Sequence, residues 1–164
     1  MKILLPVDGS PASLHAVRHA LRLVDEGLRA SFVLVNAQPS ATLYEVVTAH
    51  DPDVIREVRG AAGADLVAAA EALLEGAGVE FETEVIGGDP EHVIVEAVER
   101  YGCDAIVMGA HGAGGWRAAL LGSVSQSVLQ HSPVPVTVVS LADDEADAAP
   151  AGDEGAPEDE ADEG

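Results

Sequence analysis

The sequence predicts an α/β protein built on a five-stranded parallel sheet. Short apolar runs alternate along the chain with segments of helical periodicity, which is the pattern of strands joined by crossover helices. Five such runs and about four helical segments follow one another in β-α-β-α-β-α-β-α-β order. Because right-handed crossovers place helices on both faces of a parallel sheet, we expect a doubly wound, Rossmann-like fold.

The first strand is predicted by an apolar run, and the first helix by residues typical of a helix start. An apolar run follows Lys2 and ends at Asp8, which predicts a strand and a turn. Ser10 and Pro11 then begin a helix, because a capping hydroxyl followed by proline is typical of a helix start. The apolar face of this helix recurs every three or four residues, at Leu14, Val17, Leu21, Val24 and Leu28.

The middle of the chain predicts two strands and one helix. A second strand covers Phe32 to Ala37, and residues 38–48 are irregular. A helix begins near Asp53 or Ala61 and ends at Leu74, before two glycines at positions 76 and 78. Residues 79–86 alternate apolar side chains with glutamates, so we expect an edge strand with one solvated face.

The last third of the chain predicts two helices and two strands. Asp89 and Pro90 open a helix that ends before Gly102. A buried strand at residues 104–108 and a helix after Gly122 follow. The last strand covers Val134 to Val139, flanked by prolines.

Composition favours one soluble domain. The chain has 164 residues, 48% of them hydrophobic, and no run reaches the ~18 apolar residues of a membrane span. The first residues do not form a signal peptide. Cys103 is the single cysteine, so the simplest compartment is a reducing cytoplasm, and we interpret the thiol as buried and structural.

The charge divides the chain into a domain, residues 1–141, and an acidic tail, residues 142–164. The net charge is −21, and the tail holds 11 acidic residues and no basic one. Such acidity argues against a nucleic-acid partner, which needs a basic surface. The tail lacks large apolar residues, so we expect it to be disordered, either as a solubilising or partner-binding arm or as a permissive extension.

A glycine motif suggests a phosphate site. Gly109 and Gly112 follow the strand at 104–108, and Gly122 and Ser123 stand at the start of the next helix. A helix start offers unpaired N–H groups and partial positive charge to an anion. Glycines allow the backbone to approach a ligand closely.

At these residues the chain resembles the universal stress protein family, in particular its ATP-binding branch. The resemblance also includes the first strand and turn, the second strand at Phe32 to Ala37 and the last strand, and it covers residues 1–141. It implies the strand order 3-2-1-4-5 and an adenine-nucleotide-binding fold. Ligands of such sheets bind at the carboxyl ends of the strands where the order reverses, here between the first and fourth strands.

Asp8 stands at this switch point. Its carboxylate is suited to a ribose hydroxyl or a metal ion, and the alternative is a turn residue that caps the helix. The resemblance implies that Pro6 and Val7 flank the base and that the Ala37 backbone meets adenine, with Asn36 as the alternative if the register differs. Ser123 and Ser125 are candidate phosphate donors, and their alternative role is to cap the helix. The full set of expected nucleotide contacts is Pro6, Val7, Asp8, Ala37, Met108, Gly109, Gly112, Gly122, Ser123, Val124 and Ser125.

The chain has no Walker-type phosphate loop, because Lys2 is its only lysine. We therefore expect ATP to bind with Mg²⁺ or Mn²⁺, and Asp8 is the candidate metal ligand. His111 and Arg117 lie in the motif but are more simply exposed loop residues, and Trp116 more simply anchors the loop. His15 and His19 have metal-ligand spacing, but they share the polar helix face with arginines and lack a third ligand.

Three functions follow from these interpretations. The first is an ATP-binding regulatory or stress-response module, with an unknown regulatory partner. The second is an adenylylating or slowly ATP-hydrolysing enzyme, and the third is a dimeric scaffold that binds no nucleotide. The resemblance also implies a homodimer, formed by pairing of the last strand, Val134 to Val139, with Thr137 near its centre.

Overall fold

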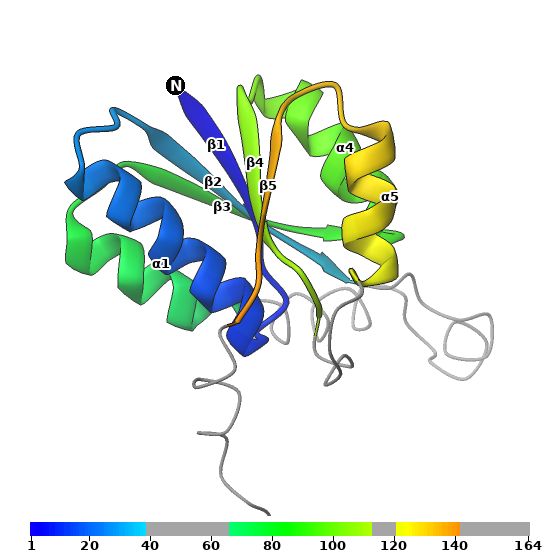
Figure 1. Ribbon diagram of the computed structural model, residues 1–164, viewed down its shortest axis with the longest axis horizontal. Coiled ribbons are helices and arrows are strands. Elements are labelled where there is room, and N and C mark those ends of the chain that lie inside the picture. The colour runs from blue at the N-terminus through cyan, green and yellow to red at the C-terminus, as the bar shows by residue number, and fades with distance from the viewer. Residues whose placement is uncertain (39–65, 113–120, 142–164) are drawn as a thin grey trace, which may run out of the picture.

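The sheet has five parallel strands in the order β3-β2-β1-β4-β5 (Figure 1). The computed structural model describes residues 1–38, 66–112 and 121–141. The order and the all-parallel pairing confirm the predicted sheet. The strands are β1 (Lys2–Pro6), β2 (Ser31–Gln38), β3 (Phe81–Gly87), β4 (Ala105–Gly109) and β5 (Val136–Val139).

Helices cover both faces of this sheet, as predicted. Helix α1 (Pro11–Asp25) and the helical residues 66–77 lie on one face, and α4 (Pro90–Tyr101) and α5 (Ser123–His131) lie on the other (Figure 1). Each face has its own apolar core because strand side chains alternate between the two faces. In β2, Phe32 and Leu34 pack in the first core, and Val33 and Val35 pack in the second.

The predicted starts of α1 and α4 are confirmed by their capping geometry. The Ser10 side chain accepts a hydrogen bond from the backbone amide of Ser13 at 3.1 Å. Asp89 does the same for the amide of Glu91 at 3.0 Å. Helix α4 ends at Gly102, whose positive φ of 64° suits glycine.

The predicted apolar face packs on the first core, with Val17 fully buried and Leu14, Leu21, Val24 and Leu28 partly buried, and α1 buries further residues beside it. Its most deeply buried side chains are small ones, whereas the leucines pack at the margins of the core. Small side chains let the helix axis come close to the sheet. The buried residues of α1 are Ala12, Ser13, Ala16, Val17 and Ala20.

The edge strands also match the expectation. The glutamates of β3 are exposed while its alternate side chains are half-buried, and Glu82 forms a 3.0 Å ion pair with Lys2. Among the described strands, β5 pairs only with β4 and forms the opposite edge. The helix at 66–77 continues through Gly76 and ends at Gly78, where φ is 66°.

Several predicted features lie outside the described residues. They are the irregular stretch after Gln38, the helix start near Asp53 or Ala61, Trp116, Arg117 and the tail at 142–164. Among the residues that are described, no helix is long and apolar enough to cross a membrane.

Candidate functional site

A cavity of about 420 Å³ opens at the carboxyl ends of β1 and β4, where the strand order reverses. This volume is within the range of small-molecule sites. Every residue predicted to contact a nucleotide lines the cavity: Pro6, Val7, Asp8, Ala37, Met108, Gly109, Gly112, Gly122, Ser123, Val124 and Ser125. The fold thus brings together residues from four separate parts of the sequence.

Part of the cavity wall was not predicted from the sequence. Ser13 comes from α1, Val35 from β2, and Pro90 and Ile94 from α4. The start of α4 was predicted, but nothing in its local pattern shows that it faces the glycine motif. Ala110 and His111 complete the lining.

Among the described residues, no side chain caps the start of helix α5, which lies at the cavity. Gly122 occupies the capping position and offers no side chain, whereas α1 and α4 are capped by Ser10 and Asp89. The alternative role of Ser123 and Ser125 as caps is therefore wrong. An uncapped helix start leaves backbone N–H groups and the positive end of the helix dipole available to an anion.

The side chain of Ser125 is buried and contacts the protein backbone. Its buried hydroxyl lies 2.8 Å from the carbonyl oxygen of Ala110 and 2.9 Å from that of Gly122, so its single proton is donated to one of them. The Gly122 amide also donates to Ala110, at 2.9 Å. These bonds fix the start of α5 against the end of β4.

The glycines of the motif occupy positions with different steric surroundings. A Cβ on Gly109 would lie 2.8 Å from the carbonyl carbon of Ala12, so this glycine permits β4 to pack on α1. Gly109 also lines the cavity, so the close packing on α1 is a second reason for glycine beside the predicted approach to a ligand. A Cβ on Gly122 would lie 3.3 Å from the Ala110 oxygen.

Asp8 has the turn role considered for it in the sequence, and it also lines the cavity. Its Oδ1 accepts a hydrogen bond from the Ser10 amide at 3.0 Å, which closes the turn before α1. Its Oδ2 lies 2.7 Å from the position that a Cβ of Gly112 would take, so Gly112 lies close to the carboxylate. Asp8 therefore orders the turn while lining the cavity.

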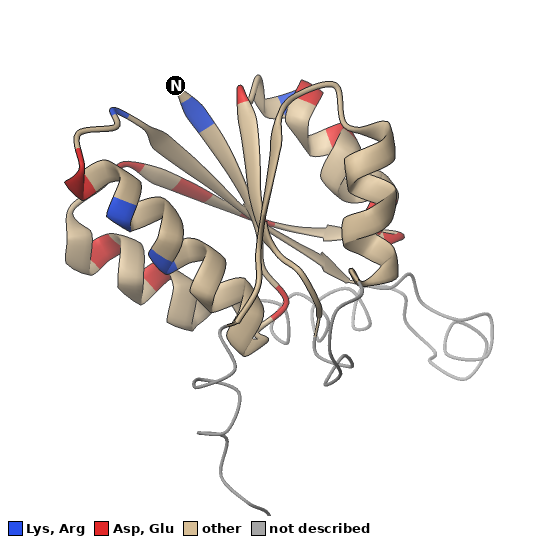
Figure 2. Cartoon of the chain, in the orientation of Figure 1, with Lys and Arg blue, Asp and Glu red and all other residues tan. Residues whose placement is uncertain are grey.

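Charge around the cavity is sparse. Among the described lining residues, Asp8 is the single carboxylate, and none is lysine or arginine. Helix α5 contains no aspartate, glutamate, lysine or arginine (Figure 2). No group of three or more candidate metal ligands occurs among the described residues, so a cation at Asp8 would need oxygen atoms from its ligand or from water.

The backbone of β2 alternates between its two neighbours. The amide of Phe32 donates to Glu80 on the β3 side, and the carbonyl of Val35 accepts from Val7 on the β1 side. By this alternation, the amide and carbonyl of Ala37 face β1 just beyond its last residue, whereas those of Asn36 face β3. The geometry thus favours Ala37 over Asn36 as the residue whose backbone reaches the cavity.

The side chain of Asn36 links the ends of β1 and β2. It is 1% exposed, and its Nδ2 donates to the Val7 carbonyl at 2.7 Å. Its Oδ1 accepts from the side-chain amide of Gln38. Sequence reasoning did not assign this role, because it depends on two strand ends that are 29 residues apart in the chain.

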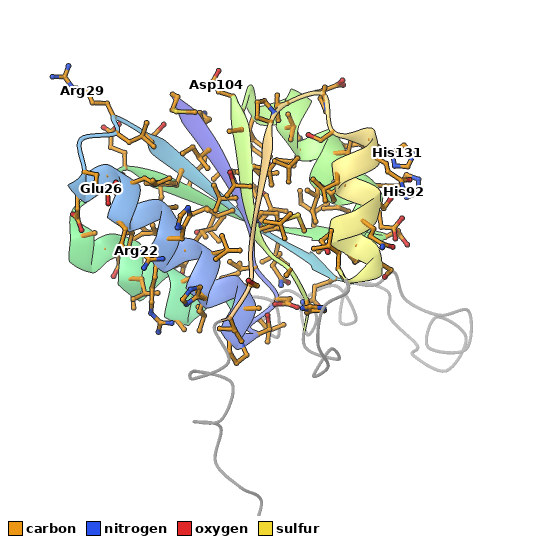
Figure 3. All side chains as sticks on the ribbon, in the orientation of Figure 1. Arg22, Glu26, Arg29, His92, Asp104 and His131 are labelled. Atoms are coloured by element: carbon orange, nitrogen blue, oxygen red, sulfur yellow. The ribbon has the colours of Figure 1, made fainter. Side chains whose placement is uncertain are left out.

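Cys103 and His19 lie outside the cavity lining. Cys103 is buried, as predicted, and burial raises the pKa of its thiol. His19 contacts Arg22 on α1. Figure 3 shows Arg22 and Asp104 at the periphery of the molecule.

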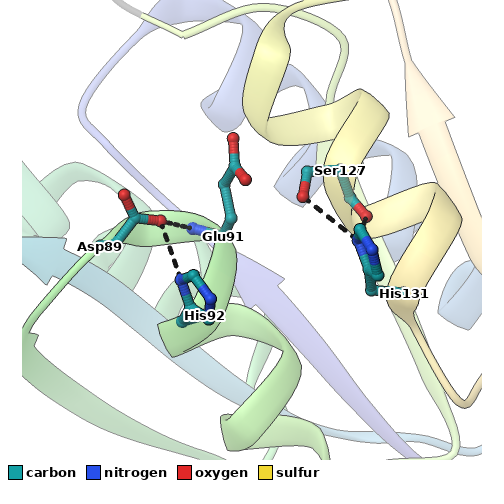
Figure 4. A network of polar contacts seen from close by, with 5 residues as sticks. All are labelled: Asp89, Glu91, His92, Ser127 and His131. Atoms are coloured by element: carbon teal, nitrogen blue, oxygen red, sulfur yellow. Dashed lines mark hydrogen bonds and ion pairs between the residues drawn. The ribbon is translucent and has the colours of Figure 1, made fainter.

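Two further histidines have short-range partners. His92 lies 3.4 Å from Asp89 at the start of α4, and His131 is 2.9 Å from the Ser127 carbonyl on α5 (Figure 4). Both histidines are exposed. Each contact is local, because its two residues are three or four positions apart in the chain.

Comparison with known proteins places this chain in a family. The family model described as "Universal stress protein family" matches residues 1–140. Universal stress protein MJ0531 of Methanocaldococcus jannaschii is 32% identical over 138 residues, which cover 84% of this chain and 81% of that protein.

Solved structures share the fold. MJ0577 from the same organism superposes with a TM-score of 0.73 at 25% identity, over 87% of this chain and 96% of that chain. A universal stress protein family protein from Arabidopsis thaliana, solved with AMP bound, superposes with a TM-score of 0.62 at 21% identity, over 88% and 94% of the two chains. The chain described here belongs to the universal stress protein family.

Proposed function

We propose that this protein binds an adenine nucleotide in the cavity and acts as a dimeric, cytoplasmic, nucleotide-dependent regulatory or stress-response module. The preferred ligand is ATP with Mg²⁺ or Mn²⁺. The observation that carries the proposal is the uncapped start of α5, which opens on a cavity of suitable size. In α1 and in α4 a capping side chain accepts from one first-turn amide, whereas α5 has no such cap among the described residues.

The phosphates are assigned to the α5 end of the cavity. The amides of Ser123, Val124 and Ser125 are the donors there, together with the Ser123 hydroxyl. The Ser125 hydroxyl already donates to a carbonyl, so its backbone amide is the better candidate. Glycine at position 122 keeps space for a phosphate beside the first turn.

The base is assigned to the opposite part of the wall, near the end of β2. Ala37 offers one amide donor and one carbonyl acceptor on the same side of the strand. Pro6, Val7 and Ile94 supply apolar surface for the flat ring. A donor and acceptor pair between apolar walls suits adenine, whose edge carries both an acceptor nitrogen and an amino group.

A divalent cation completes the proposed complex. A triphosphate would bring negative charge close to Asp8, in a cavity whose described lining has no lysine or arginine. Mg²⁺ or Mn²⁺ coordinated by Asp8, phosphate oxygens and water would offset this repulsion. AMP in a structural neighbour supports an adenine nucleotide as the ligand class.

The nucleotide that co-purifies with the protein tests the proposal. Freshly purified protein is denatured by heat, and the released small molecules are separated by ion-exchange chromatography. We expect ATP in a substantial fraction of molecules. AMP after incubation with ATP would favour the enzyme alternative. Protein without nucleotide that also fails to bind added Mg-ATP in calorimetry would support the scaffold alternative and contradict the proposal.

The free edge of β5 supports the proposed homodimer. The carbonyls of Pro135 and Val139 accept from β4, so the backbone groups of Val136 and Val138 face away from the sheet. An apolar edge strand with free backbone groups favours pairing with a second copy. The two β5 strands would then meet around a two-fold axis near Thr137.

Val138→Pro is expected to convert the dimer to a monomer. Proline removes the outward amide while leaving the β4 side of the strand able to pair, and proline is tolerated at such edges. Val138→Ala keeps the amide and is the matched control, which we expect to remain dimeric. Light scattering at tens of micromolar, a range suited to an interface of standard size, measures both variants. A wild-type monomer at this concentration would remove the dimer hypothesis.

A further inference from the structure

The β1–β2 ladder stops one hydrogen bond before β2 ends. Its bonds run from the Ser31 amide to the Met1 carbonyl at the start, and from the Val7 amide to the Val35 carbonyl at 2.9 Å at the other end. In a regular parallel ladder, the next bond would join the Ala37 amide to the Val7 carbonyl. That bond would close the part of the ladder that faces the cavity.

The side chain of Asn36 takes the place of this bond. Its Nδ2 donates to the Val7 carbonyl at 2.7 Å, and the carbonyl pairs with no backbone amide among the described residues. The amide group is held at its other end too, because Gln38 donates to its Oδ1. Asn36 is almost fully buried, so water does not compete for these contacts.

We propose that Asn36 is a positioning residue that ends the β1–β2 ladder and so keeps the Ala37 amide available to the base of a bound nucleotide. This inference rests on the proposed function, since it concerns the same cavity. Asn36 itself does not line the cavity, whereas Val7 and Ala37 both do. The side chain therefore acts through the two backbone groups that it separates.

The bond pattern itself is tested in the ligand-free wild-type protein by NMR. Scalar couplings across hydrogen bonds identify donor and acceptor directly. We expect a coupling between the Asn36 side-chain amide and the Val7 carbonyl carbon, and rapid exchange of the Ala37 amide with solvent. A coupling between the Ala37 amide nitrogen and the Val7 carbonyl carbon would overturn the inference, whatever the protein binds.

The effect on binding is tested with Asn36→Leu, a change that keeps side-chain size and removes the donor. We expect the Ala37 amide to pair with Val7 and become protected from exchange. The affinities for Mg-ATP and AMP should fall about tenfold, as for the loss of one hydrogen bond in a closed site. The affinity for inorganic tripolyphosphate with Mg²⁺ should stay unchanged, because that probe has no base.

Thr83→Val is the matched control. It removes a buried hydroxyl from the neighbouring strand β3, with no described hydrogen-bond partner, and should change neither Ala37 exchange nor affinity. Equal ATP affinity in Asn36→Leu and the wild type would refute the positioning role. An equal loss for ATP and tripolyphosphate would refute it too, because it would indicate general damage to the site. If the wild type binds no adenine nucleotide, the proposed function fails, and the NMR couplings still decide how the ladder ends.

Discussion

Gly122→Val is expected to abolish the stabilisation of the protein by Mg-ATP. A ligand that binds only the folded state at about 100 times its dissociation constant adds about 2.7 kcal/mol to the free energy of unfolding. A Cβ at position 122 would already lie 3.3 Å from the Ala110 oxygen and 3.7 Å from the Ser125 hydroxyl. The two methyl groups of valine would extend further and fill space beside the first amides of α5, where we place the phosphates.

Thermal denaturation with and without millimolar Mg-ATP measures this effect. Gly76→Val is the matched control, because a Cβ on this helical glycine meets nothing within 4 Å. The control should keep the full rise in melting temperature. A wild-type melting temperature that does not respond to Mg-ATP would count against the nucleotide site. A normal response in Gly122→Val would place the phosphates elsewhere.

Gly109→Ala is expected to destabilise the protein whether or not nucleotide is present. The added Cβ would lie 2.8 Å from the Ala12 carbonyl carbon and 2.9 Å from its oxygen, and backbone cannot move aside as a side chain can. Overpacking of this kind costs about 1–3 kcal/mol. For a chain of this size, the melting temperature should fall by roughly 2–4 °C per kcal/mol.

Gly87→Ala provides the comparison for this variant. Gly87 also lies at the carboxyl end of a strand, but a Cβ there meets nothing within 4 Å. Its melting temperature should stay within about 2 °C of the wild type, because surface changes away from specific contacts have small effects. If the two variants melted at the same temperature, β4 would not pack on α1 as closely as described.

The local elements could be predicted from the sequence because their signals are local. The hydroxyl of Ser10 before Pro11 marks a helix start in any context, and it caps α1 in the structure. The alternation in residues 79–86 shows an edge strand, because one face of β3 meets water. The glycine spacing pointed to the end of the sheet where the cavity lies, and the predicted contact residues line that cavity.

Strand order was available only through family resemblance, because periodicity shows that a segment is a strand but not which strand it joins. The structural role of each motif glycine could be seen only in the tertiary structure. Gly109 and Gly122 belong to one motif, but the first packs on α1 and the second leaves α5 without a side-chain cap.

The role of Asn36 could likewise be seen only in the tertiary structure. In the sequence it is one polar residue within an apolar run, and its local pattern predicts only a strand. Its hydrogen bond to Val7 exists because the sheet places two distant strand ends side by side. Backbone propensity acts over a few neighbouring residues and is therefore readable from sequence, whereas the partner of a buried polar group depends on segments that meet only when the whole chain is folded.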